Sequence, residues 1–327
     1  MNKPLNILIL SVGTRNKIVQ YFKKELNGIG KIYAADNSVL APALYEAHDF
    51  FITPRIEEKE YINSILKICK ENRINAILSL IDPELNILAE HKDDFENIGV
   101  LPIVSSKSAI DLSFNKFKMN NFLKENGFNS IKSYIKLEEF YKDKNAKLIE
   151  FPVFVKPFNG SASSDISKVN NKKQLDSIFN EKNGLMIQEY INGREFGADV
   201  YIDLISGEPI SIFVKEKLKM RAGETDKSVS YKDNYLFDLI MEFVRKIDFR
   251  GIIDIDIFKV KDKYYISEVN PRFGGGYPHA YESGINVPQM IIKNLNGIAN
   301  HQNIGQYETD IFMMKYSDLM IKNKNGK

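Results

Sequence analysis

Residues 251–276, GIIDIDIFKVKDKYYISEVNPRFGGG, concentrate side chains that can bind a metal ion. An apolar run with two acidic residues is followed by a second run with an acid and an amide: Asp254, Asp256, Glu268 and Asn270. A polar break of hairpin length, Lys261 to Lys263, separates the runs, so the pattern predicts two antiparallel strands. Arg272 and three glycines follow directly.

The pairing of these two strands decides whether the four polar groups meet. If Asp262 is the centre of the turn, Asp256 faces Glu268 and Asp254 faces Asn270. All four then lie on one face, because side chains alternate along a strand. Like charges directly opposite each other are destabilising, so the pattern favours a bound cation, and oxygen ligands suit a hard divalent ion. A shift of one residue would send half of these groups to the other face.

The first hundred residues alternate buried strands with amphipathic helices. Strands are expected at 5–12, 31–35 and 76–81, and helices at 18–26, 60–72 and 84–92. This alternation predicts a parallel sheet, whose ligands lie beyond the carboxyl ends of the strands. Asp82 and Glu84 follow such an end, which makes them candidates for contact with a small substrate. Capping of the next helix by Asp82, with Pro83 at its first position, explains the same residues equally well.

A strand, a glycine and a later acid also raise the question of a dinucleotide cofactor. Residues 11–16, SVGTRN, contain one glycine where the phosphate-binding fingerprint needs three. We therefore do not expect NAD here, and a dehydrogenase is kept only as a rival interpretation of this unit.

Two lysines and a loop of small residues are candidates for binding phosphate. Lys116 lies at the start of a helix within residues 105–128, and Lys156 ends an expected strand at 151–155. The turn that follows, residues 159–164, contains Gly160, Ser161 and Ser163. Small residues let backbone N–H groups approach an anion closely. Taken alone, these features also fit a solvated surface lysine and a plain hairpin turn.

The next expected strands offer groups for a nucleotide base and its sugar. Residues 185–188 are an expected strand, and the short irregular stretch that follows can offer backbone groups to an adenine edge. Glu195 begins a long strand, and its carboxylate can accept ribose hydroxyls. A solvent-facing strand residue is the alternative for Glu195.

Residues 210–230 are expected to begin as a strand and to continue as a charged loop. Lys215 and Arg221 are among its cations, and Gly223 is a candidate hinge. One interpretation is a lid whose cations close over phosphates and exclude water. The alternative is a solvated surface loop without a function. His279, which follows the glycines, is a candidate either for substrate contact or for a structural role.

The composition narrows the class of protein. The 327 residues suffice for two or three domains with their own cores. With 45 basic and 43 acidic side chains, the formal net charge is +2, which gives no electrostatic case for nucleic acid or a membrane surface. Cys69 is the only cysteine, and the apolar run that ends at Gly13 is too short to span a membrane. We therefore expect a cytoplasmic protein without nucleic acid or membrane partners.

These pieces, in this order, resemble the ATP-grasp superfamily, and most closely the short, carbamoyl-phosphate-synthase-like branch of carboxylate–amine ligases. The most specific match is Asp256 followed by SEVNPR at 267–272, which is similar to the family's acid, then acid-x-Asn-Pro-Arg signature. The resemblance covers nearly the whole chain.

The resemblance implies an α/β and α+β fold, in which a Rossmann-like parallel sheet precedes a two-subdomain ATP-grasp domain. The expected divisions are a pre-ATP-grasp domain at 1–104, subdomain A at 105–184, subdomain B at 185–320 and a disordered tail at 321–327. Two departures from the family pattern stand out. Asp254 is an additional acid on the metal face, and Pro157-Phe158 places an aromatic ring beside the small-residue loop.

The resemblance also implies a role for each candidate residue. ATP phosphates would be held by Lys116, Lys156, Gly160, Ser161 and Ser163, adenine by Gln188, Glu189 and Ile191, and ribose by Glu195. Mg²⁺, with Mn²⁺ as an alternative, would be bound by Asp256, Glu268 and Asn270. Arg272 would grip the transferred phosphate, and Lys215 and Arg221 would be cations of the lid.

The implied activity is ATP-dependent ligation. A substrate carboxylate would attack the γ-phosphate of ATP, and an amine would then attack the acyl phosphate. The alternatives are carboxylation or phosphorylation without an amine, and a nucleotide-binding regulator without catalysis. The substrates are expected to be small molecules, with Asp82, Glu84 and His279 as pointers to their pocket. Because dimers are common in the family, a homodimer is one expected assembly.

Overall fold

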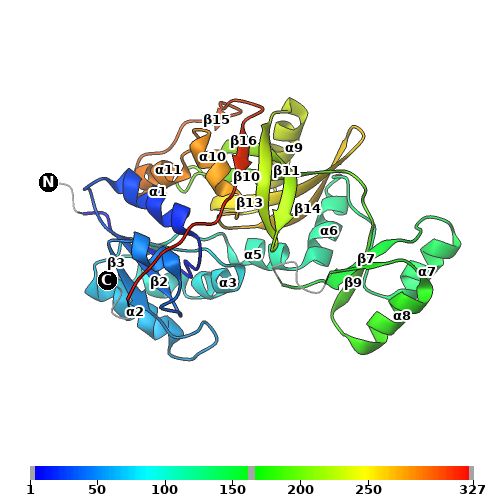
Figure 1. The fold of residues 1–327 in the computed structure, drawn as a ribbon, viewed down its shortest axis with the longest axis horizontal. Coiled ribbons are helices and arrows are strands. Elements are labelled where there is room, and N and C mark those ends of the chain that lie inside the picture. The colour runs from blue at the N-terminus through cyan, green and yellow to red at the C-terminus, as the bar shows by residue number, and fades with distance from the viewer. Residues whose placement is uncertain (1–3, 161–165, 324–327) are drawn as a thin grey trace.

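The chain folds around three β-sheets that follow one another along the long axis of the molecule (Figure 1). The structure is a computed structural model, and it describes residues 4–160 and 166–323. Ser161 and Ser163, two of the predicted phosphate-binding residues, lie outside the described residues.

The N-terminal sheet is parallel, as predicted, with strand order β3-β2-β1-β4-β5. Its strands are β1 (Ile7–Leu10), β2 (Ile32–Asp36), β3 (Asp49–Ile52), β4 (Ala76–Ser79) and β5 (Leu101–Pro102). Its helices are α1 (Asn16–Leu26), η1 (Pro42–Glu46), α2 (Tyr61–Glu71), α3 (Asp82–Glu90) and α4 (Lys92–Glu96). Both faces are covered, since Ile7 and Ile9 belong to one apolar core and Leu8 and Leu10 to another.

A four-stranded sheet, of order β6-β9-β7-β8, forms the opposite end of the molecule (Figure 1). It consists of β6 (Ser133–Tyr134), β7 (Val153–Pro157), β8 (Ser167–Val169) and β9 (Leu185–Glu189), with α7 (Leu137–Asn145) and α8 (Lys172–Glu181). Strand β9 pairs with β6 and β7. The sheet topology therefore favours a division of the chain after β9 and not before it.

Two helices, α5 (Lys107–Phe114) and α6 (Lys116–Glu125), occupy the region where one helix was expected. Asn115 separates them, because its extended backbone ends α5 and its side chain accepts a hydrogen bond from the Lys118 backbone N–H at the start of α6. Lys116 therefore stands at the first position of α6, as predicted.

The central sheet is mainly antiparallel, of order β14-β13-β10-β11-β12-β16, and β15 pairs with β11. Its strands are β10 (Arg194–Ile202), β11 (Pro209–Arg221), β12 (Glu224–Tyr231), β13 (Gly251–Val260), β14 (Lys263–Asn270), β15 (Asn303–Ile304) and β16 (Phe312–Met314). Its helices are α9 (Asn234–Arg245), α10 (Tyr277–Glu282) and α11 (Val287–Leu295).

The prediction of a charged loop within residues 210–230 is wrong, because this segment forms a long β-hairpin. Strand β11 runs for 13 residues and pairs with β12 up to the tip, where Arg221 faces Glu224. Ala222 and Gly223 make the turn, both with positive φ, which is the backbone that two-residue hairpins favour. The basic residues Lys215, Lys217, Lys219 and Arg221 recur at a period of two, and this spacing is typical of a strand.

The predicted pairing of the acidic strands is confirmed, although the turn differs. Asp256 faces Glu268 and Asp254 faces Asn270. The turn contains two residues, because Val260 already pairs with Lys263. This shorter turn shifts the pairing by one residue. A bulge between the pairs of Ile257 and Asp256 removes the shift and restores the expected register. Ser267 is the additional residue on β14.

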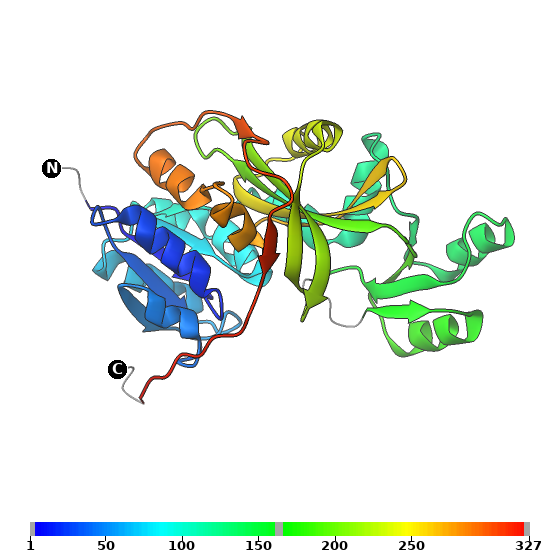
Figure 2. The same ribbon diagram turned by 45° about the horizontal axis from the view of Figure 1, so that its top comes forward.

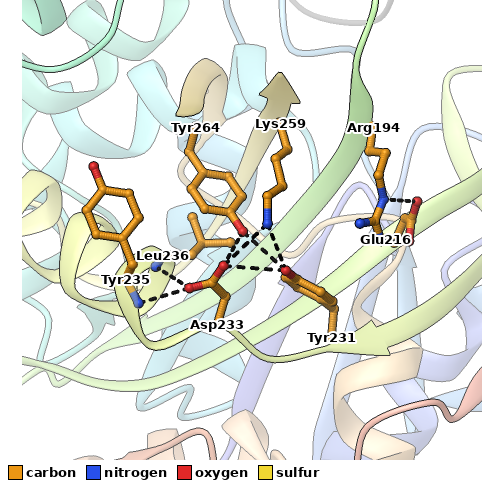
Figure 3. A network of polar contacts seen from close by, with 8 residues as sticks. All are labelled: Arg194, Glu216, Tyr231, Asp233, Tyr235, Leu236, Lys259 and Tyr264. Atoms are coloured by element: carbon orange, nitrogen blue, oxygen red, sulfur yellow. Dashed lines mark hydrogen bonds and ion pairs between the residues drawn. The ribbon is translucent and has the colours of Figure 1, made fainter. Parts of the chain in front are cut away.

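A polar network beside Asp233 joins the strands near the start of α9 (Figure 3). The Asp233 carboxylate accepts hydrogen bonds from the first backbone N–H groups of α9 and from the Tyr264 hydroxyl. Lys259 lies 3.0 Å from the Tyr231 hydroxyl and 3.5 Å from Asp233. Residues of β12, β13 and β14 therefore share one anchor, which fixes these strands relative to one another.

The N-terminal sheet and the central sheet are packed together through α1 and α10. The Tyr21 and Tyr281 rings stack with their centroids 3.6 Å apart, and the Tyr21 hydroxyl donates to Glu282 over 2.8 Å. The last described residues run back along the N-terminal unit (Figure 2), where Lys322 lies over the Tyr45 ring. Among the described residues, no helix combines the length and the apolar character needed to cross a membrane.

His279 lies inside the protein. It is 2% exposed, and its ring packs against Phe213. Its Nδ1 is 2.8 Å from the Ser228 hydroxyl, and its Nε2 is 3.0 Å from the Ile311 carbonyl oxygen. Burial, followed by the charge of Lys215, lowers the pKa of His279 to about 4. Of the two roles considered for His279, these contacts favour the structural one.

We predict that His279 makes the protein less stable in mild acid. As the pH falls below 6.5, the unfolded ring binds a proton and the folded ring does not until about pH 4, so stability is lost across this window. NMR titration should find a pKa of about 4 for the His279 ring, well below the ordinary value of 6.5. His279→Gln should reduce the loss of unfolding free energy between pH 7 and 5 by about 2 kcal/mol, measured by urea denaturation. The exposed His301→Gln is the control, and a His279 ring that titrates near 6.5 would contradict the prediction.

Candidate active site

Four neighbouring strands of the central sheet present charged side chains on one face. The pairing of β10 with β13 places Asp199 opposite Asp254 and Gly197 opposite Asp256. The pairing of β13 with β14 adds Glu268 and Asn270 to the same face. Carboxylates therefore sit opposite one another across adjacent strands, and this arrangement is unfavourable without nearby cations.

Two lysines from β11 provide the first of these cations. Lys215 is 1% exposed and forms an ion pair with the equally buried Asp199. Lys217 is 4% exposed and reaches two acids, with its Nζ 2.6 Å from Asp256 and 3.1 Å from Glu195. Both lysines cross above Gly197, where a Cβ atom would lie 3.2 Å from Lys217 Cε and 3.4 Å from Lys215 Cε. The absence of a side chain at Gly197 thus lets the lysines reach the acids.

Lys215 is not a lid cation, because it is buried in the sheet and paired with Asp199. Arg221 stands near the hairpin tip, is 58% exposed and pairs with Asp226 over 3.2 Å. Lys217 was not singled out from the sequence. A strand assignment for β11 would have identified it, because Lys217 then lies on the same side of the sheet as Lys215.

The charges on this face change the pKa values of the groups involved. Burial, followed by the charge of Asp256, raises the pKa of Asp254 to about 6. Burial alone would lower the pKa of Lys217, but the Asp256 and Glu195 carboxylates hold it above its ordinary value. Lys217 is therefore a permanent cation on the face that carries the predicted metal ligands.

The two predicted phosphate lysines meet at the edge of the same face. Lys116 Nζ lies 3.3 Å from Glu268 and also donates a hydrogen bond to the Gly160 carbonyl oxygen. Lys156 is the next-to-last residue of β7 and is 8% exposed. Burial lowers the pKa of Lys156 to about 8, and the Glu268 charge offsets this effect only in part. The described part of the loop, up to Gly160, lies beside Lys116, because the Lys116 backbone N–H donates to the Phe158 carbonyl oxygen over 2.8 Å.

The residues predicted to bind the base and sugar lie on two elements. Gln188 and Glu189 end β9, and the Gln188 amide donates to the Ser133 hydroxyl over 3.1 Å. Ile191 follows in the connection to β10 and is half-buried. Glu195, at the start of β10, is joined to the acidic face through Lys217.

Arg272 links the acidic face to the N-terminal unit. Its Nη2 is 2.7 Å from Asp82, and its Nη1 donates to the Phe273 carbonyl oxygen. Burial acts to lower the pKa of Arg272, but the charge of Asp82 keeps this pKa above its ordinary value. Asp82 is the first residue of α3 and makes no capping hydrogen bond with its side chain, so the capping alternative is wrong.

Glu84 lies below the surface and does not reach the acidic face. It is fully buried and accepts hydrogen bonds from the hydroxyls of Ser11, Tyr61 and Ser79. Burial raises its pKa, although these hydrogen bonds act in the opposite direction. The contacts of Glu84 therefore support the end of β1 and the start of α3, close to Asp82.

A second charged group lies next to Arg272. Arg15 Nη2 is 2.8 Å from Glu224 at the hairpin tip, and Lys315, which follows β16, is 2.7 Å from the other Glu224 oxygen. Asp82, Asp254 and Arg272 are close enough to influence the Arg15 charge. No local pattern connects these residues, because they come from opposite ends of the chain.

The predicted metal ligands suit a hard divalent cation, since Asp256, Glu268 and Asn270 supply carboxylate and amide oxygens from facing positions. Within the described residues, no group of three His, Cys, Asp or Glu side chains forms a metal site by itself. Lys217 and Lys116 already balance the charges of Asp256 and Glu268. A metal ion would therefore have to compete with these lysines, and accompanying phosphate groups would give the lysines another partner.

Comparison with known proteins agrees with this geometry. The model of the ATP-grasp domain matches residues 113–276, and that of the PylC-like N-terminal domain matches residues 7–103. The D-alanine--D-alanine ligase of Acetivibrio thermocellus is 28% identical over 200 residues, which are 51% of this chain and 51% of the relative. A carbamoyl-phosphate synthase of Methanobrevibacter smithii is 25% identical over 82% of this chain and 74% of the relative.

The similarity in fold extends over nearly the whole chain. The solved N5-carboxyaminoimidazole synthetase from Staphylococcus aureus has a TM-score of 0.72 at 18% identity, covering 93% of this chain and 80% of that one. By contrast, the chain spans only 51–64% of the length of the first D-alanine--D-alanine ligases that it matches. The family model covers half of the sequence and includes the two lysines, the acidic face and Arg272. The chain belongs to the ATP-grasp family.

Proposed function

We propose that this protein is an ATP-dependent ligase that activates a substrate carboxylate as an acyl phosphate and transfers the acyl group to an amine. The observation that carries the proposal is the convergence of Lys116, Lys156 and Arg272 on the acids of β13 and β14. Such a set of cations and acids suits the phosphates of a nucleotide together with a divalent metal ion.

In this proposal, ATP binds between the four-stranded sheet and the central sheet. Lys116, Lys156 and the loop at Gly160 hold its phosphates, and the end of β9, at Gln188 to Ile191, receives adenine. Glu195 accepts the ribose hydroxyls, and its ion pair with Lys217 holds this carboxylate in position. The lysines from both sides provide fixed positive charge where the phosphates lie.

Asp256, Glu268 and Asn270 would hold Mg²⁺, with Mn²⁺ as an alternative. When bound, this ion neutralises charge on the phosphate oxygens and so favours phosphoryl transfer. Lys217 and Lys116 stabilise the acids until a metal–nucleotide complex binds. Because the lysines and the metal ion compete for the same carboxylates, metal binding should be stronger with nucleotide than without it.

The reaction has two balanced steps. A carboxylate oxygen bonds to the γ-phosphorus, the bond from that phosphorus to the bridging β–γ oxygen breaks, and ADP leaves. The amine nitrogen then bonds to the acyl carbon, the carbon–oxygen bond to phosphate breaks, and inorganic phosphate leaves with the proton that the nitrogen loses. In this proposal Arg272 holds the transferred phosphoryl group through both steps, and its ion pair with Asp82 fixes the direction of its guanidinium group.

Small-molecule substrates, a cytoplasmic location and a homodimer complete the proposal. The alternative within the same fold is ATP-driven carboxylation or phosphorylation without an amine. Bicarbonate dependence of ATP turnover would identify that alternative, whereas dependence on an amine supports ligation. A regulator without catalysis would bind nucleotide and release no phosphate with any substrate pair.

Replacing Glu268 tests the metal site. Glu268→Gln should lower Mg²⁺-dependent phosphate release by roughly 100-fold or more, because the amide neither carries the charge nor binds the ion as strongly. Phosphate release is measured with wild type, with this variant and with the control Glu71→Gln, which changes an exposed helical acid. Circular dichroism establishes that the variants are folded. Wild-type turnover by a folded Glu268→Gln protein would exclude Glu268 as a metal ligand.

Replacing Lys156 tests the phosphate site. Lys156→Ala should raise the dissociation constant of Mg·ADP about 10- to 100-fold, since one charged hydrogen bond contributes about 1.5–3 kcal/mol. Isothermal titration calorimetry provides the measurement, and Lys173→Ala, at an exposed position of α8, is the matched control. Equal affinity in wild type and Lys156→Ala would remove Lys156 from the phosphate site.

A further inference from the structure

We propose that two copies of this chain associate through strand β16, so that their central sheets join into one continuous sheet. The two β16 strands pair in antiparallel direction about a two-fold axis at Met314. The inference rests on the proposed function only for the homodimer, to which it assigns an interface, and it is independent of the ligase reaction.

Strand β16 is an uncovered edge of the central sheet. It is the last strand on its side, and of the described residues only those of β12 pair with it. No other described helix or strand packs extensively along it. The opposite edge, β14, is covered by α5 and α6, and its Tyr264 carbonyl oxygen accepts a hydrogen bond from the Asn129 side chain over 3.0 Å. The two edges of one sheet therefore differ in their need for a partner.

The pairing with β12 determines which backbone groups of β16 are free. The Ile311 carbonyl oxygen and the Lys315 N–H each form a hydrogen bond to the β12 backbone over 2.9 Å. Backbone groups alternate in direction along an antiparallel strand, so Phe312 and Met314 direct theirs away from β12. Unpaired groups of this kind are a template for another strand.

The side chains along this edge are apolar and exposed. Phe312, Met314 and Tyr316 are 62%, 65% and 84% exposed, and their spacing of two places them on one face. The extended segment that follows adds Leu319 and Ile321, which are 87% and 85% exposed. Contiguous apolar surface of this kind marks an interaction site. The row at 312, 314 and 316 also lacks the charges and prolines that protect the free edges of monomeric sheets.

Lys315 does not protect this edge, although it lies within the same segment. Side chains alternate along the strand, so Lys315 points to the other face. Its ammonium group is 2.7 Å from Glu224, which also pairs with Arg15. The charge of Lys315 is therefore directed toward the rest of the protein, and the apolar row stays open to a partner.

The order of the side chains in the row identifies this partner as a second copy. Two identical edges pair about a two-fold axis as antiparallel strands, and the same patch then faces itself. The row is symmetric in its residue types, because an aromatic ring lies two residues before Met314 and another two residues after it. An axis at Met314 thus places Phe312 opposite Tyr316 of the second copy, and each Met314 opposite the other.

This register satisfies the side chains and the backbone together. Aromatic and other apolar pairs across strands stabilise a sheet. Phe312 and Met314, whose backbone groups point outward, also occupy the hydrogen-bonded positions of the new pairing. Asp310, with a φ of +63°, turns the chain just before β16 and so limits the length of the pairing.

The first experiment is sedimentation of the full chain over about 1–100 μM. Wild type should form a dimer of twice 37.5 kDa. Met314→Lys should raise the dissociation constant of the dimer at least about tenfold, because it places two ammonium groups opposite each other and removes two buried apolar side chains. Met314→Leu should keep the dimer. Leu148→Lys, which changes a 54% exposed residue beyond α7, is the matched control and should behave as wild type. Circular dichroism establishes that the variants are folded.

The second experiment tests the register by cross-linking. Residues of a hydrogen-bonded antiparallel pair have Cα atoms about 5.5 Å apart, which a disulfide can span. Met314→Cys should therefore give a covalent dimer under mild oxidation, whereas the native Cys69 is buried and should not react. Phe312→Cys, which faces Tyr316 of the second copy, should cross-link at least about tenfold more slowly. Leu148→Cys should remain uncross-linked.

Each outcome decides the proposal. A wild-type chain that stays monomeric would overturn both the interface and the homodimer, and would leave the edge to a strand of another protein. A dimer that survives Met314→Lys, or that Met314→Cys fails to cross-link, would place the contact elsewhere. If Met314→Lys does not fold, the cross-link decides. None of these results bears on the ligase proposal, which Glu268→Gln tests separately.

Discussion

The crowding of carboxylates on one face of the central sheet is the constraint on which the rest of the structure depends. Asp254 faces Asp199 on one side, and Asp256 faces Glu268 on the other. Acids placed opposite one another on a sheet repel each other, and burial strengthens this repulsion. Lysines from β11 and α6 compensate it within the protein. The same cations are then available to a nucleotide, which supports a site whose metal and phosphates bind together.

This constraint also explains why three sheets are needed. The central sheet supplies the acids, the four-stranded sheet supplies Lys156, and the N-terminal sheet supplies Asp82, which directs Arg272. The stacked tyrosines of α1 and α10 hold the N-terminal sheet in place. The candidate site is therefore assembled at the junction of units that pack against each other.

The sequence predicts much of this arrangement where local rules apply. Alternation along β13 and β14 was enough to predict the acid pairs. The shorter turn and the bulge at Ser267 were not predicted, because their effects on the register cancel and neither has a signature in the sequence. Because residues 210–230 carry many charges, the period of two in their basic residues was not recognised as that of a strand. The hairpin was therefore not predicted, and neither were the contacts of Lys217 with the acidic face. The pair of Arg15 and Glu224 depends on tertiary packing between residues 209 positions apart, which no local propensity encodes.

The most direct test of the account is a crystal structure with Mn²⁺ and a non-hydrolysable ATP analogue, with the anomalous signal used to locate the metal. The account predicts a manganese peak bonded to Asp256, Glu268 and Asn270 at about 2.1 Å, the distance typical of Mg²⁺. It also predicts that Lys116 and Lys156 contact the phosphates. Nucleotide bound without metal at these residues, with Lys217 and Lys116 still paired with Asp256 and Glu268, would contradict it.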